Sequence, residues 1–191
     1  RGLPSLPPEK TVNLLRLTCK HEPQFKVGKV RPPPVLLAAG REQIILNPRS
    51  AIHHGRGPKG YELTVQEIAD ERAPPELRYI VFPWSATALA LSWRIRCRRS
   101  AAYQVRLHHY CPDAHAGSLY ELSVNREKRT GDLPGTGAMP LDHPKDFRRF
   151  KAVALGEIRL KKGMNRIAFK TLRMKTSYFF TFFRALVLTG C

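Results

Sequence analysis

A chain of 191 residues with 42% apolar residues is long enough for one packed domain plus an extended segment. No window approaches the roughly 18 unbroken apolar residues of a membrane-spanning helix, which excludes such a helix. Lys and Arg number 33 against 15 Asp and Glu, a net charge of +18. Two interpretations stay open: a compartment of basic proteins, such as the mitochondrial matrix, or an anionic partner, namely RNA, an anionic lipid surface or acidic protein.

Residues 1–40 are predicted to form an extended N-terminal arm, and residues 41–191 the folded domain. The arm is rich in proline, which favours extended and poorly paired backbone. The chain starts at Arg1 rather than Met, without a signal-peptide pattern, so we expect that a leader or an upstream domain has been removed.

From residue 43 on, apolar residues follow the period of two that is typical of strands. A short apolar run at 44–46 and an alternating run at 61–67 come first. The clearest alternation lies at 89–98, with a second at 103–111. The connection between these two runs is short enough to predict a β-hairpin.

Further strands are predicted at 120–125, 150–155, 157–160, 165–172 and 179–188, whereas glycines and prolines predict a loop over 126–146. Many short strands without a helical period predict an all-β sandwich or barrel. We expect its core to contain Trp93, Tyr103, Val105, Leu107, Leu122, Leu160, Ile167 and Phe169.

Several of these segments resemble the strands of galactose-binding-like β-sandwich domains. Leu91–Ile95 looks like the strand with a buried Trp, Ala102–Leu107 like the "G-x-Y-x-V-x-L" strand, and Gly117–Val124 like the strand that follows. The most specific segment, Leu155–Ile167, is similar to the "lG-x-v-x-L-x-x-G-x-n-x-i" signature, and Arg184–Leu188 is similar to the closing strand.

The resemblance spans about residues 43–188 and implies an antiparallel jelly roll, the fold of many non-catalytic carbohydrate-binding modules. In that family, sugar sites lie in loops or on an open sheet face and are built from stacking aromatic and polar side chains. No residue of this chain matches such a site one by one, and the outward strand positions are largely Arg and Lys.

Reactive side chains do not form a recognisable catalytic or metal-binding motif. His108 and His109 point to opposite faces of one predicted strand, so only His109 and Cys111 share a face. The acidic residues between 62 and 76 are expected to be solvated. The four cysteines are too far apart in sequence for a dense disulfide framework, so we expect free thiols, with a Cys97–Cys111 bond as the alternative. We therefore predict no enzyme, cofactor or metal.

Four arginines are predicted to form one basic face that binds a partner. Arg94, Arg96 and Arg98 stand at alternate positions of one strand, and Arg106 lies on its predicted hairpin partner. Like charges on one sheet face repel each other, and guanidinium groups pair well with phosphates and carboxylates. An anionic partner is one explanation, and an ordinary solvated surface is the other.

Our first hypothesis is a non-catalytic accessory subunit of a large organellar assembly, predicted to be mitochondrial. The host would be a respiratory or ATP-synthase-type membrane complex or a ribosome, with other protein subunits, RNA or anionic lipid headgroups as partners. The alternative is a carbohydrate-binding module of a larger secreted glycan-active enzyme, with a glycan as its partner.

Overall fold

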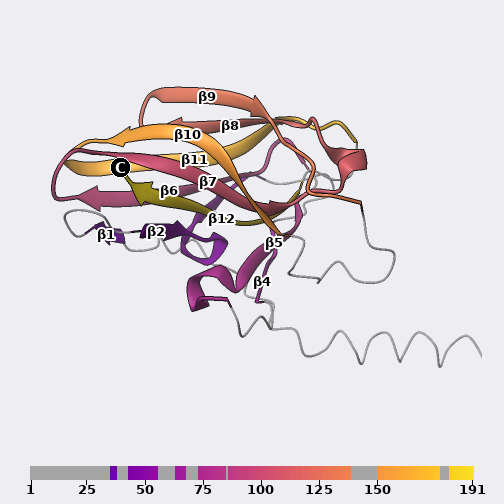
Figure 1. Cartoon of the computed structure of the whole chain (residues 1–191), viewed down its shortest axis with the longest axis horizontal. Coiled ribbons are helices and arrows are strands. Elements are labelled where there is room, and N and C mark those ends of the chain that lie inside the picture. The colour runs from indigo at the N-terminus through magenta and orange to yellow at the C-terminus, as the bar shows by residue number, and fades with distance from the viewer. Residues whose placement is uncertain are drawn as a thin grey trace, which may run out of the picture.

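The computed structural model describes residues 35–37, 43–55, 63–67, 73–84, 86–138, 150–176 and 181–191, and it forms a β-sandwich of two six-stranded sheets (Figure 1). Sheet A contains β1 (Val35–Leu37), β3 (Ile52–His54), β6 (Ala90–Cys97), β8 (Leu119–Val124), β9 (Glu127–Asp132) and β11 (Gly163–Arg173). Sheet B contains β2 (Gln43–Leu46), β4 (Val65–Glu67), β5 (Tyr79–Trp84), β7 (Ala101–Tyr110), β10 (Lys151–Leu160) and β12 (Thr181–Gly190).

Nearly all strand pairs are antiparallel, and the described helices are three single 3₁₀ turns: Pro48–Ser50, Pro75–Leu77 and Asp113–His115. None of the described segments is a helix with the length and hydropathy needed to cross a membrane. The predicted all-β sandwich is confirmed.

The core lies between the two sheets and is centred on aromatic rings. Trp93 of sheet A stacks on Phe183 of sheet B at 6.0 Å between centroids, and Trp84 of sheet B meets the edge of Phe169 of sheet A at 5.8 Å. The Trp93 indole N–H donates to the Asn47 carbonyl at 2.9 Å. All eight residues predicted for the core are buried, so the predicted face of each of these strands is confirmed.

The predicted hairpin between the two alternating runs is wrong. β6 ends at Cys97 and β7 begins at Ala101, but the two strands belong to different sheets. β6 pairs with β11 on one edge and with β1 and β3 on the other, while β7 pairs with β10 and β12. Alternation reports which face is buried, not which strand is the hydrogen-bonded neighbour, so the short connection at 98–100 crosses from one sheet to the other.

A strand also occupies part of the predicted loop over 126–146. β9 pairs with β8 through a tight turn in which Asn125 adopts a left-handed φ of 55°. Position 131 of this strand requires glycine, because a Cβ there would lie 2.6 Å from the Tyr120 hydroxyl. None of the β9 residues is buried, so the apolar alternation that marks other strands is missing. Residues 139–149 lie outside the described residues.

Two runs predicted as separate strands, at 150–155 and 157–160, form the single strand β10. Its register against β7 shifts between Ala154 and Gly156, and Gly156 has a φ of +97°, which favours glycine. This bulge breaks the alternation in the sequence without ending the strand.

The N-terminal range predicted as an arm contributes at least one strand to the sandwich. Val35–Leu37 forms β1, which pairs with β6 in parallel. Residues 1–34 and 38–42 lie outside the described residues, so the rest of the predicted arm stays a prediction. β3 and β5 were not predicted, because each is short or contains no clear alternation.

Candidate functional site

The β10–β11 turn is held by the buried side chain of Asn165. Its Oδ1 accepts from the Lys161 backbone N–H at 3.0 Å, and its Nδ2 donates to the carbonyl oxygens of Lys161 at 2.8 Å and Gly163 at 3.2 Å. The same Nδ2 lies 3.5 Å from the Cys97 sulfur of β6. Gly163 supplies the left-handed φ of +94° that the turn needs. One amide therefore fixes the turn and attaches it to β6.

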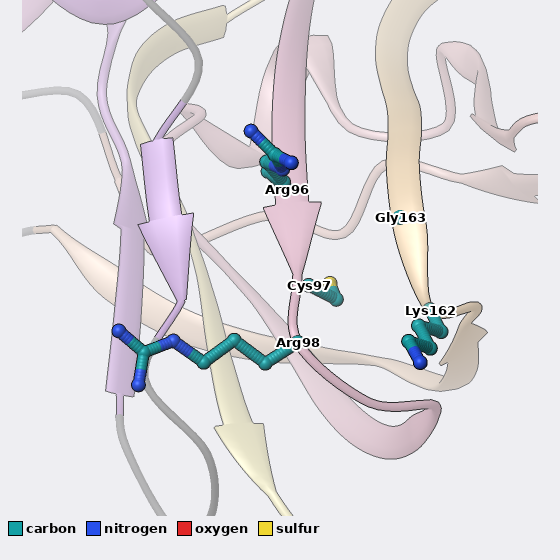
Figure 2. A pocket seen from close by; sticks show the side chains of 5 residues that line it. All are labelled: Arg96, Cys97, Arg98, Lys162 and Gly163. Carbon is teal, nitrogen blue, oxygen red and sulfur yellow. The ribbon is translucent and has the colours of Figure 1, made fainter.

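This turn meets the connection between the sheets, where β6 ends and β7 begins. The Lys162 backbone N–H donates to the Ser100 hydroxyl at 3.0 Å. Between the two segments lies an open hollow of about 350 Å³, lined by Arg96, Cys97, Arg98, Lys162 and Gly163. Figure 2 shows that the Arg98 side chain extends away from Lys162, so the charged groups surround the hollow and do not meet at one point.

The hollow presents hydrogen-bond donors and no acidic side chain. Arg96, Arg98 and Lys162 are exposed, and none of them makes an ion pair or side-chain hydrogen bond within the described parts of the chain. Guanidinium and ammonium groups donate and cannot accept. Burial raises the pKa of the Cys97 thiol, with the Asn165 hydrogen bond opposing that rise, so no thiolate offsets the cations. The hollow suits a group rich in acceptor oxygens.

The positive charge continues along the outer face of sheet A. Arg94 on β6 lies directly opposite Arg166 on β11, and both side chains are exposed. Burial is the largest cause of the lowered pKa of His54, and the positive charge of Arg166 is the next. We call the five residues Arg94, Arg96, Arg98, Lys162 and Arg166 the cationic row.

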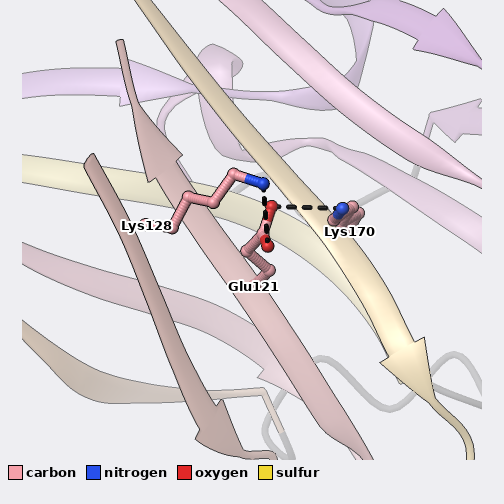
Figure 3. Close-up of polar contacts among 3 residues, drawn as sticks. All are labelled: Glu121, Lys128 and Lys170. Atoms are coloured by element: carbon pink, nitrogen blue, oxygen red, sulfur yellow. Dashed lines mark ion pairs between the residues drawn. The ribbon is translucent and has the colours of Figure 1, made fainter. Parts of the chain in front are cut away.

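The other half of the same face is balanced by acid. The Glu121 carboxylate of β8 forms ion pairs with Lys170 at 3.2 Å and with Lys128 at 3.7 Å (Figure 3). Its side chain is only 11% exposed, so the carboxylate is held between the two ammonium groups. Within the described residues, Arg94, Arg96 and Arg166 have no such carboxylate beside them, so their positive charge is not offset by an ion pair.

The structure separates the four arginines predicted to form one basic face. Arg94, Arg96 and Arg98 point outward from sheet A, as predicted for that strand. Arg106 points outward from sheet B, opposite Ala154 and Val187, because β6 and β7 are not neighbours. The site predicted at all four is thus wrong in its geometry, and partner binding by the other three stays a prediction.

Two members of the row, Lys162 and Arg166, were not predicted from the sequence. Both lie in the segment that resembles the family signature, where the pattern was interpreted as a turn followed by a core strand. The alternation with Ile167 and Phe169 does place Arg166 outward. Only the pairing of β11 with β6 places it beside Arg94.

The described residues contain no group of three His, Cys, Asp or Glu side chains at metal-binding distance. His109 is buried in the core, its Nδ1 lies 3.2 Å from the Thr181 hydroxyl, and burial lowers its pKa to about 4. Burial also raises the pKa of the Cys111 thiol to about 12. Both groups are neutral at pH 7 and unsuited to acid–base or nucleophilic chemistry.

Neither family models nor curated sequences contain a match to this chain. Solved structures do match. A family 35 carbohydrate-binding module from Clostridium thermocellum is 13% identical with a TM-score of 0.56, over 78% of this chain and 99% of the module. The family 35 module from Cellvibrio japonicus Abf62 is 16% identical with a TM-score of 0.53, over 78% of this chain and 94% of the module.

A multidomain enzyme contains a similar domain. The GH26-CBM35 β-(1,4)-mannanase from Podospora anserina is 13% identical with a TM-score of 0.53, over 80% of this chain and 28% of the enzyme. At these identities the likeness shows the fold alone. The chain has the galactose-binding-like β-sandwich fold, as its sequence segments implied.

Proposed function

We propose that this protein is a non-catalytic carbohydrate-binding module. The observation that carries the proposal is its likeness to a family 35 module over 99% of that module's length, so the likeness covers the whole fold of that module. The same fold also occurs as 28% of a mannanase, where a binding module accompanies a separate catalytic part. Because a fold can host several functions, the proposal needs a binding test.

The shape and chemistry of the surface fit a binding role. The two sheets bury their apolar faces against each other, so the sandwich is a rigid support for its turns and outer faces. The hollow lined by Arg96, Arg98 and Lys162 is open to solvent and offers hydrogen-bond donors to a ligand. Its lining contains no Asp, Glu or His side chain that could act as a general acid or base.

The solved structures favour this function over an accessory subunit of a mitochondrial assembly. The similar structures described above give no support to a protein, RNA or lipid partner for that first hypothesis. Its remaining basis is the net charge of +18. Mitochondrial and secreted locations both stay predictions.

A binding screen with the purified full chain tests the proposal. Labelled protein is applied to an array of neutral, carboxylated and sulfated polysaccharides, and binding is confirmed by affinity electrophoresis. We expect retention on at least one polysaccharide, with no release of reducing ends on prolonged incubation. Release of reducing ends would show an enzyme. An absence of binding to every glycan, together with capture of RNA or anionic vesicles, would return the accessory-subunit hypothesis to first place.

A further inference from the structure

We infer that the ligand is a sulfated glycan, held along the cationic row by several sulfate groups at once. This inference rests on the proposed function and adds the ligand class and the residues that recognise it. The row consists of Arg94, Arg96, Arg98, Lys162 and Arg166, all exposed on the β6–β11 side of sheet A.

The row supplies donors without acceptors, and this determines which sugar groups fit. A neutral sugar presents hydroxyl groups that both donate and accept, and it packs its ring on an aromatic side chain. None of the Trp, Tyr or Phe residues whose side chains the structure describes is largely exposed, and the row offers the sugar no side-chain acceptor. An anionic group only accepts, so it matches guanidinium and ammonium donors.

The arrangement of the row favours a chain of anions over a single one. Arg94 and Arg96 occupy alternate residues of β6, which separates their backbone positions by about 6.6 Å, and Arg98 follows in the bend directly after the strand. Arg98 extends away from Lys162 in Figure 2, so one small anion does not reach all the charges. A polymer with charges at regular intervals engages them in sequence.

The pairing of Arg94 with Arg166 favours a bound anion near these two side chains. Arg94 and Arg166 are directly opposite across antiparallel strands, where like charges destabilise the sheet. In the other half of the face, Glu121 separates Lys128 from Lys170. No carboxylate of the described chain does the same for Arg94 and Arg166, so a bound anion would relieve their repulsion.

An apolar contact favours a glycan over other polyanions. Met164 lies directly opposite Arg96 and is 46% exposed. It is the more exposed of the two exposed large apolar side chains in the described chain. A flexible thioether can pack against the C–H face of a sugar ring. Single-stranded nucleic acid is instead held by aromatic side chains on which bases stack, and the row contains none.

The number of acceptor oxygens favours sulfate esters over carboxylates. A carboxylate has two oxygens in one plane, and a guanidinium bound in bidentate geometry contacts both of them. A sulfate ester has three terminal oxygens. Arg96 on β6 and Lys162 in the β10–β11 turn both line the hollow, so a sulfate held by the arginine keeps an oxygen for the lysine.

The backbone around the hollow is fixed before a ligand arrives. Asn165 closes the turn that holds Lys162, and the Ser100 hydroxyl ties that turn to the end of β6. Only the side chains of the row need to be ordered on binding, which limits the entropic penalty of association.

Affinity electrophoresis with matched polymers tests the inference. The probes are a sulfated galactan, the same galactan after desulfation, polygalacturonate and poly(U) RNA, with the full chain as the protein. We expect retardation by the sulfated galactan at about 0.1 M salt that fades towards about 1 M, because screening shortens the reach of the charges. Desulfation should weaken binding by at least about tenfold.

Two double variants locate the site. Arg94→Gln with Arg166→Gln removes two cations from the row, while Arg106→Gln with Arg159→Gln removes two exposed cations from sheet B. We expect the first pair to weaken binding to the sulfated galactan at least about tenfold and the second pair to change it less than about twofold. Thermal unfolding of both variants checks that each is folded.

Each contrary outcome has its own meaning. Equal binding of the sulfated and desulfated galactans overturns the inference and leaves the proposed function intact. Polygalacturonate binding as tightly as the sulfated galactan overturns the assignment of sulfate. Equal losses in the two double variants show a general charge effect and overturn the row as the site. Tightest binding to poly(U), with no glycan retained, overturns the inference and the proposed function together.

Discussion

Arg94 on β6 and Arg166 on β11 lie directly opposite each other across an antiparallel strand pair, and both side chains are exposed. Neither forms an ion pair with any residue in the described part of the chain. The two guanidinium groups therefore repel each other on a surface that carries little acid.

Replacing Arg166 by Gln should stabilise the fold. Loss of the like-charge contact is expected to raise the free energy of unfolding by about 0.2–1 kcal/mol at low salt. The gain should shrink at about 1 M NaCl, where charges are screened over about 3 Å. Urea unfolding at two salt concentrations measures it. Arg106→Gln is the control, because Arg106 faces the uncharged Ala154 and Val187.

The same substitution should raise the pKa of His54. Burial is the largest cause of its lowered pKa, and Arg166 is the next. Removing the cation should therefore move the pKa part of the way back towards 6.5. An NMR titration of the imidazole protons would follow it. An unchanged His54 pKa in Arg166→Gln would mean that the field of Arg166 does not reach this side chain.

Asn165→Asp should loosen the β10–β11 turn. The substitution keeps Oδ1, which accepts from Lys161, and removes the amide hydrogens donated to the carbonyl oxygens of Lys161 and Gly163. Buried carbonyls without donors cost about 1–3 kcal/mol, which urea unfolding would register. Asn125→Gly is the matched control, because it keeps a left-handed turn residue and removes only the peripheral bonds to Asn165 and Arg166. A larger loss in the control would contradict the central role of Asn165.

Trp93→Ala should destabilise the protein by about 3–5 kcal/mol, the usual loss when a large aromatic side chain is truncated in a core. Trp93→Phe should cost less. A phenyl ring retains stacking on Phe183, and the Asn47 carbonyl keeps the hydrogen bond from the Ser50 hydroxyl after the indole N–H is gone. Thermal and urea unfolding of the two variants provide the comparison. Equal stability of Trp93→Ala and wild type would refute the central position of this ring.

Buried His109 should make the protein less stable in mild acid. Its pKa is about 4 in the folded state and near 6.5 in an unfolded chain, so between these values the unfolded state binds more protons. Stability is therefore fully present above pH 6.5 and should fall by up to about 3 kcal/mol as the pH approaches 4.

The control for this pH dependence is His109→Gln, which cannot titrate. His54 and His108 also have lowered pKa values, so some loss of stability in acid should remain in the variant. The dependence of its unfolding free energy between pH 6.5 and 4 should be shallower than that of wild type. Parallel curves would show that His109 does not drive the loss.

The strands with strong alternation were predictable from the sequence, and those without it were not. Trp93 and Leu107 alternate with polar neighbours, so their burial follows from the pleat of one strand. β9 carries mostly polar residues on an exposed edge, and β10 contains a bulge before Gly156. Neither feature leaves an apolar period in the sequence.

Part of the candidate site was predictable, because alternation within one strand shows which side chains point outward but not which strand lies beside it. The outward direction of Arg94, Arg96 and Arg98 was predicted, whereas Lys162 and Arg166 were missed and Arg106 was wrongly included. All three errors arise from a single wrong pairing of strands.

The amino-acid sequence alone determined the all-β class, the buried face of each alternating strand and the excess of positive charge, because these depend on local periodicity and composition. The tertiary structure decided which strands are neighbours. Hydrogen-bond pairing joins residues far apart in the chain, and it is selected by how two apolar faces pack together. That selection places Arg166 beside Arg94 and sends Arg106 to the opposite sheet, since β6 finds its partner in β11 and not in the strand that follows it.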